Sequence, residues 1–131
     1  MEKKIKRISL VLFCIYIIAV VALCVIKTND LPELPKYFLG IPFDKIAHFI
    51  MFFPFIILGY ASFSPTGKNL WKKVLILGIM LMVGCVFAFS TEKLQAMTSY
   101  RSYEILDMAA DSIGLICGTF ITLIYIIIFL P

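Results

Sequence analysis

Four long apolar runs divide this chain and decide what it can fold into. They cover residues 8–26, 44–63, 74–91 and 105–130, and polar or proline-containing stretches separate them. An α-helix needs about 20 apolar residues to cross the hydrocarbon of a bilayer, and each run is close to that length. Lipid offers the backbone no hydrogen-bond partners, so such runs span as helices. The sequence therefore predicts an all-α integral membrane protein with four transmembrane helices in one bundle.

The composition excludes most soluble alternatives. The chain is 62% hydrophobic and 15% charged, with a mean hydropathy of +1.02. Soluble domains average about 45–50% apolar residues, so residues 1–131 are predicted to form a single membrane domain. Nucleic-acid binding is not expected. The four cysteines lie inside apolar runs without a C-x-x-C pair, which favours small buried hydrophobic residues over a disulfide or a zinc site.

The basic residues predict how the bundle is oriented. The chain starts with "MEKKIKR", and the first run is longer than the apolar core of a signal peptide, so we expect a retained helix. With the amino terminus in the cytoplasm, seven basic residues lie inside and five outside. The inner set is Lys3, Lys4, Lys6, Arg7, Lys68, Lys72 and Lys73, and the outer set is Lys27, Lys36, Lys45, Lys93 and Arg101. The cluster before the first helix favours both termini in the cytoplasm.

Several residues are expected to have structural roles. Residues 27–43 contain three prolines and predict a loop, whose aromatic part suits the membrane interface. Asp44 is expected to cap the amino terminus of the second helix, and Pro54 is expected to kink that helix without breaking it. Lys72 and Lys73 are expected to be snorkelling anchors.

Polar residues gather at the predicted outer end of the bundle. Asp44 and His48 are four residues apart and share a helix face, and Glu92 and Gln95 are three apart if the third helix continues outward. Arg101 and Glu104 lie in the loop before the fourth helix. Three helices thus bring polar groups to the same depth.

The fourth run carries acids and glycines on one stripe. Asp107, Asp111, Gly114 and Gly118 follow each other at helical spacings of four, three and four residues. The two glycines form a G-x-x-x-G step, which lets another helix approach closely. We therefore expect this face to point into the bundle, with Gly114 and Gly118 at a helix contact.

The acids on that stripe need compensation. An ionised acid in hydrocarbon costs roughly 2.5–3.5 kcal/mol on insertion scales. Asp111 lies one turn deeper than Asp107, so it must be neutralised by a cation, by hydrogen bonds or by a proton. Lys45 and Arg101 are the available cations, and His48 is a third when it is protonated.

Two segments resemble signatures of the VanZ-like family of membrane proteins. "DKIAHF", at residues 44–49, resembles the D-K-x-x-H-F signature, and "EKLQAMTSYRSYEILDMAADSIG", at 92–114, is similar to the second one. The matching positions of the second signature are Glu92, Gln95, Arg101, Asp107, Asp111 and Gly114. The family usually has Asn where this chain has Asp111. Because ionised Asp only accepts hydrogen bonds, Asp111 either carries a proton or pairs with an additional cation.

The resemblance implies a multi-pass protein of the bacterial cytoplasmic membrane. It also implies a role in reduced susceptibility to teicoplanin- and lipoglycopeptide-type antibiotics, and it implies no enzyme class. The resemblance thus predicts the location of the protein and its role in susceptibility. Its chemistry has to be predicted from the polar residues.

The polar residues support three hypotheses for that chemistry. In the first, a pocket binds an anionic membrane lipid or a lipid-linked cell-wall precursor, since Lys and Arg bind phosphate. In this predicted pocket, Lys45, His48 and Arg101 contact the anion. Four further residues hold these basic side chains in place: Glu92, Gln95, Asp107 and Asp111. The second is a membrane enzyme that uses a metal or acid–base catalysis, and the third is a purely structural network. We predict no cofactor and no bound metal, assign no catalytic residue and specify no oligomeric partner.

Overall fold

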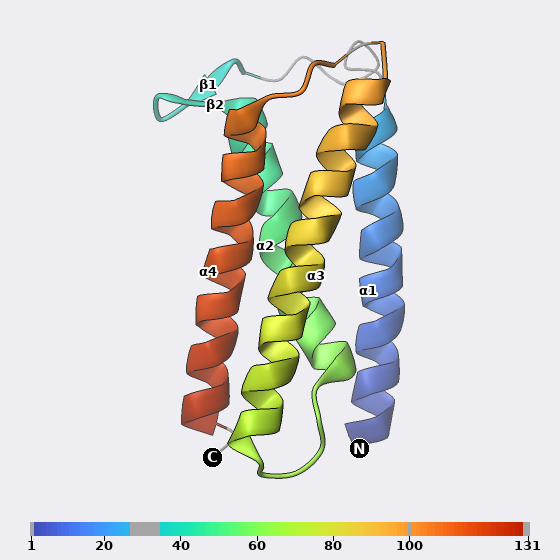
Figure 1. The fold of residues 1–131 in the computed structure, drawn as a ribbon, viewed down its shortest axis with the longest axis vertical. Helices are drawn as coiled ribbons and strands as arrows, with labels where there is room; N and C mark the ends of the chain where they lie inside the picture. The colour runs from blue at the N-terminus through green and yellow to red at the C-terminus, as the bar shows by residue number, and fades with distance from the viewer. Residues whose placement is uncertain (1, 27–34, 100, 130–131) are drawn as a thin grey trace.

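Four long helices and a short β-hairpin make up the described part of the chain (Figure 1). The computed structural model describes residues 2–26, 35–99 and 101–129. The elements are α1 (Glu2–Val25), β1 (Tyr37–Phe38), β2 (Ile41–Pro42), α2 (Phe43–Phe63), α3 (Leu70–Met97) and α4 (Ile105–Phe129). All four helices are long and apolar enough to cross a membrane. This confirms the predicted all-α membrane fold with four spanning helices.

The third helix is longer than predicted at both ends. It begins before the predicted span 74–91 because the Asn69 side chain accepts a hydrogen bond, 3.1 Å long, from the backbone N–H of Lys72 and caps the helix. It also continues past that span to Met97 and carries Glu92 and Gln95, which are both buried. These two polar residues are therefore on one helical face, as their spacing required.

α2 and α4 begin within one residue of the predicted spans, and α1 and α2 end within one residue of them. α1 starts before residue 8 and includes the basic opening segment, since Lys and Glu are good helix formers. α2 runs without a break through Pro54. The predicted end of the fourth helix, residue 130, lies outside the described residues.

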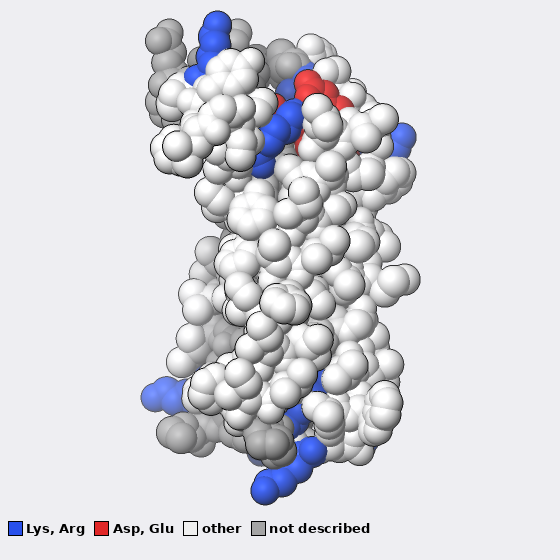
Figure 2. Space-filling view, turned by 90° about the vertical axis from the view of Figure 1, so that its left-hand side faces the viewer, with Lys and Arg blue, Asp and Glu red and all other residues white. Residues whose placement is uncertain are grey.

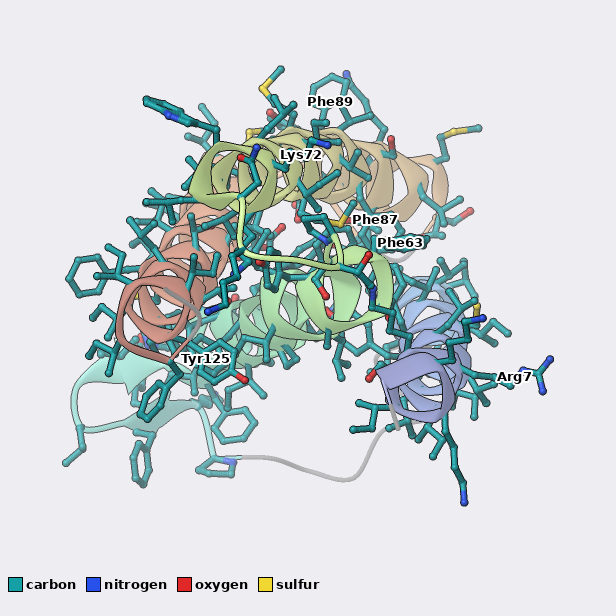
Figure 3. The ribbon with its side chains drawn as sticks, turned by 90° about the horizontal axis from the view of Figure 1, so that it is seen from below. Arg7, Phe63, Lys72, Phe87, Phe89 and Tyr125 are labelled. Carbon is teal, nitrogen blue, oxygen red and sulfur yellow. The ribbon has the colours of Figure 1, made fainter. Side chains whose placement is uncertain are left out.

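The second helix lies in the middle of the bundle. Seen from below, α2 has α4 on one side and α1 on the other, and α3 packs across α2 and α4 (Figure 3). α2 packs most extensively against α4. α1 packs on α2, where the ring of Phe13 meets that of Phe55 edge to face at 5.3 Å, and the Tyr16 hydroxyl donates to the backbone carbonyl of Met51.

Two glycines let α2 and α4 approach to backbone contact. A Cβ atom added at Gly114 would lie 2.7 Å from the Phe49 carbonyl oxygen, and one added at Gly118 would lie 2.6 Å from the Phe53 carbonyl oxygen. Neither distance allows a real side chain. The G-x-x-x-G step of α4 thus sits directly on the α2 backbone, and it fixes how the first turns of the two helices face each other.

The core is aromatic and the outer surface is apolar. Phe52 and Phe55 of α2 are buried and pack against Phe87 of α3, whose ring stacks on Phe55 at 5.5 Å. Two residues further along α3, Phe89 points outward (Figure 3) and is 50% exposed. Apolar residues also cover the outward faces of the other helices, as with Ile18, which is 68% exposed. Such a surface suits contact with lipid.

A β-hairpin precedes α2 in the region predicted as a loop. β1 and β2 pair antiparallel, and the turn between them holds Leu39 and Gly40 at positive φ. Tyr37, Phe38 and Leu39 are all exposed. The hairpin therefore presents apolar and aromatic side chains at the end of the bundle; residues 27–34 of the predicted loop lie outside the described residues.

Charge is distributed unevenly along the bundle. α1 begins and α4 ends at the same end (Figure 1). On the face shown in Figure 2, acidic side chains appear only at the opposite end, basic ones lie at both ends, and uncharged residues fill the middle. The bundle thus has one basic end and one end of mixed charge, and the predicted site residues lie at the latter.

Candidate functional site

The first turns of α2 supply two bases and one acid. The helix begins at Phe43, and Pro42 occupies the N-cap without a side-chain hydrogen bond. Asp44 lies in the first turn and contacts Lys45, so the prediction that Asp44 caps this helix is wrong. One turn further, His48 is 4% exposed. Lys45 and His48 are three residues apart on α2, so both side chains face α4.

Lys45 is surrounded by carboxylates. Its ammonium forms ion pairs with Asp44 at 2.8 Å, with Glu104 at 2.6 Å and with Asp107. The Lys45 and Asp107 side chains are 14% and 12% exposed, whereas that of Glu104 is 49% exposed. The inner contact to Asp107 is therefore the one shielded from water, and it joins α2 to α4.

His48 also faces three carboxylates, those of Glu92, Asp107 and Asp111. Its Nδ1 lies 2.8 Å from Asp111 Oδ1, which is a hydrogen bond, and 3.7 Å from Glu92 Oε1. Its Nε2 lies 3.6 Å from Asp107 Oδ2. When Asp111 is ionised it only accepts, and Nδ1 then carries the hydrogen that Asp111 receives. The imidazole joins α2, α3 and α4.

Two of these carboxylates are buried without full hydrogen bonding. Glu92 is 1% exposed and Asp111 is 0% exposed. Neither oxygen of Glu92, nor Oδ2 of Asp111, has a hydrogen-bond partner among the described residues. Burying such groups unpaired is costly, and each case calls for an explanation.

We define the polar cluster by these contacts. Its members are Asp44, Lys45, His48, Glu92, Glu104, Asp107 and Asp111. Five carboxylates thus face one ammonium and one imidazole. The cluster lies at the end of the bundle opposite to the start of α1, where the start of α2, the end of α3 and the start of α4 meet.

Five of the seven predicted pocket residues belong to the polar cluster, and two lie beside it. Gln95 is buried one turn after Glu92 and interacts with the Cys24 thiol of α1. Arg101 is partly buried, also lies on the Cys24 side, and makes no ion pair with the described residues. The cluster therefore draws on α2, α3 and α4, and Gln95 and Arg101 extend it toward α1.

Sequence reasoning missed two members of the polar cluster as site residues, Asp44 and Glu104. Glu104 stands directly before α4, and its backbone carbonyl accepts from the N–H of Asp107 at 3.2 Å. The signal in the sequence was its position three residues before Asp107, which is the spacing of neighbours on a helix face.

A separate cavity lies at the opposite end of the bundle. It has a volume of about 510 Å³, and residues of all four helices and of the segment 64–67 line it. Lys73 lines it and is 4% exposed, so the prediction that Lys73 snorkels is wrong; Lys72 is exposed. The Tyr60 hydroxyl, also at this cavity, has no hydrogen-bond partner among the described residues.

Fold and site together define a class: a small multi-pass helical membrane protein whose spanning helices share a buried cluster of acids, a lysine and a histidine. The VanZ/LLP1 family model matches residues 13–129, which include every predicted site residue. The chain belongs to the VanZ/LLP1 family. No curated protein and no solved structure gives a significant match.

Proposed function

We propose that the chain engages the anionic head group of a membrane lipid or of a lipid-linked envelope precursor beside the polar cluster. In this proposal the cluster faces the outer side of a bacterial cytoplasmic membrane. Engagement of the head group reduces susceptibility to teicoplanin- and lipoglycopeptide-type antibiotics. Family membership and the four spanning helices support the part of this proposal that places the chain in a membrane.

Arg101 is the observation that carries this proposal. It is partly buried next to the cluster and makes no ion pair with the described residues. A guanidinium group matches the oxygens of a phosphate in a bidentate geometry and favours sites that exclude part of the water. Among the three basic residues of the predicted pocket, Arg101 is therefore the one that remains available to an anionic head group.

The other predicted contacts have a different role in the proposal. Lys45 is already surrounded by three carboxylates, and His48 faces three more oxygens. Neither has positive charge to spare for an anion. They hold the first turns of α2 against α4 and so fix the surface on which the head group rests.

Susceptibility of a host that expresses the protein tests the proposal. Arg101→Ala should abolish any rise in the teicoplanin concentration needed to stop growth, and Arg101→Lys should keep part of it because the charge remains. Lys93→Ala is the matched control, since Lys93 is exposed at the same end and lies over the rings of Phe89 and Tyr103. It removes a positive charge without touching the cluster.

Two other outcomes separate the competing hypotheses. If Arg101→Ala, His48→Ala and Asp107→Asn all reach the membrane at normal levels and leave susceptibility unchanged, the proposal fails. If all three variants are lost from the membrane, the cluster is a structural network that holds the helices together.

A membrane hydrolase or transferase acting on a lipid-linked substrate is the second candidate. The pair of His48 and Asp111 at 2.8 Å favours it, because a carboxylate that orients an imidazole is a common acid–base arrangement. Purified protein should then release phosphate or a head group from a lipid-linked pyrophosphate, and His48→Ala should lose that activity.

A further inference from the structure

We propose that His48, Glu92 and Asp107 bind one divalent metal ion between α2, α3 and α4, with Asp111 as the outer partner of the histidine. This site does not depend on head-group binding. It differs from the sequence-based prediction, which assigned no metal to the chain.

The donor atoms are already close enough to share one ion. One nitrogen of His48 and one oxygen each of Glu92 and Asp107 lie within 4.8 Å of one another, and all three residues are buried. His48 Nε2 and Asp107 Oδ2 are 3.6 Å apart. Two ligands that each lie about 2.1 Å from a metal are roughly 3.0–3.4 Å apart, so a small inward movement completes the geometry.

Glu92 is the group that requires a ligand. Its side chain is 1% exposed, and neither carboxylate oxygen has a hydrogen-bond partner among the described residues. His48 Nδ1 lies 3.7 Å from Glu92 Oε1, which is longer than a hydrogen bond. A cation between Glu92 and Asp107 satisfies both carboxylates at once.

The surrounding contacts orient the donors. Asp111 Oδ1 holds His48 Nδ1 at 2.8 Å, which leaves Nε2 directed at Asp107. A metal-bound histidine commonly donates its other N–H to a carboxylate in this way. Lys45 pairs with the other oxygen of Asp107, Oδ1, and so leaves Oδ2 to the metal.

The donor set and the charge indicate the kind of ion. One imidazole and two carboxylates suit borderline divalent metals such as Zn²⁺ and Mn²⁺ better than Ca²⁺, which prefers oxygen alone. The polar cluster has five carboxylates against one ammonium and one imidazole, and two positive charges offset that excess. Three protein ligands also leave a coordination position open.

Metal binding to the full chain in detergent tests this site. After treatment with a chelator, wild-type protein should bind close to one Zn²⁺ or Mn²⁺ per chain, measured by calorimetry and by elemental analysis. Glu92→Gln and His48→Ala should weaken binding by more than the about 10–100-fold typical of a lost outer partner. Asp111→Asn should fall within that range.

Lys93→Ala is the matched control, because Lys93 follows Glu92 on α3 but is exposed and lies over the rings of Phe89 and Tyr103. It should bind the metal like wild type. The spectrum of Co²⁺-loaded wild type requires no variant, and it should show bands of nitrogen and oxygen ligands. Wild type that binds neither metal, or Glu92→Gln that binds as well as wild type, overturns the site. Neither result alters the susceptibility test of Arg101, so the two proposals fail separately.

Discussion

Substituting alanine for Gly118 should push α2 and α4 apart and destabilise the bundle. The new Cβ would lie 2.6 Å from the Phe53 carbonyl oxygen, whereas ordinary contact begins at 3.4 Å. The obstacle is helix backbone, which cannot rotate away as a side chain can. The two helices must therefore separate by about 0.8 Å, the difference between these distances, along the interface that joins them most extensively.

The expected cost is about 1–3 kcal/mol, which is typical of an overpacked core. The intrinsic helix preference of alanine over glycine, up to about 1 kcal/mol, works in the opposite direction. Gly78→Ala on α3 measures that preference alone, because a Cβ there meets nothing within 4 Å. The free energy of unfolding of Gly118→Ala should thus lie below that of wild type, and it should lie further below that of Gly78→Ala.

Unfolding in mixed detergent and sodium dodecyl sulfate, followed by circular dichroism, gives these differences. Gly114→Ala should behave like Gly118→Ala, and the double variant should cost less than the sum because one separation of the helices relieves both contacts. Equal unfolding midpoints for Gly118→Ala and Gly78→Ala would refute the backbone contact between α2 and α4.

Four further predictions concern the cluster, α1 and the orientation. Lys45→Met should cost about 3 kcal/mol, the lower end for breaking a buried pair, and adding Asp107→Asn should restore part of that stability in the same unfolding assay. Tyr16→Phe should cost about 0.5–1.5 kcal/mol, because it removes the hydrogen bond from α1 to the Met51 carbonyl. If the termini are cytoplasmic, green fluorescent protein fused to the carboxy terminus should fluoresce, and alkaline phosphatase fused there instead should stay inactive. Glu92→Met should raise the stability of metal-free protein by about 1 kcal/mol or more, measured by unfolding with chelator present.

The apolar runs sufficed to predict the helices, and helical spacing sufficed to predict part of the cluster. Asp107 and Asp111 are one turn apart, so a single orientation of α4 turns both toward the bundle. The glycines on the same stripe predicted that another helix approaches α4 closely at this face. The neighbour is α2, and its first turns carry Lys45 and His48, which is why the contacts between bases and acids form.

The remaining contacts depend on features that spacing does not encode. Glu104 reaches Lys45 only because the chain between α3 and α4 returns close to the start of α2. Gln95 interacts with Cys24 because α1 packs beside the end of α3, and the almost uniformly apolar α1 carries little pattern that predicts which face it buries. Lys73 was expected at the surface because position in the sequence does not reveal a cavity.

Glu92 decides between a structural network and a binding site. A network that locks three helices in register needs paired groups, and the contacts of Lys45 and His48 with Asp107 and Asp111 already supply them between α2 and α4. Glu92 adds a buried carboxylate that lies 3.7 Å from His48 Nδ1 and has no hydrogen bond among the described residues, and a buried charge with so little compensation lowers the stability of the fold. If Glu92 only held the helices together, Glu92→Met should therefore raise the stability of the metal-free protein. If Glu92→Met instead destabilises the metal-free protein, Glu92 has a structural partner, and no bound cation is needed to explain its burial.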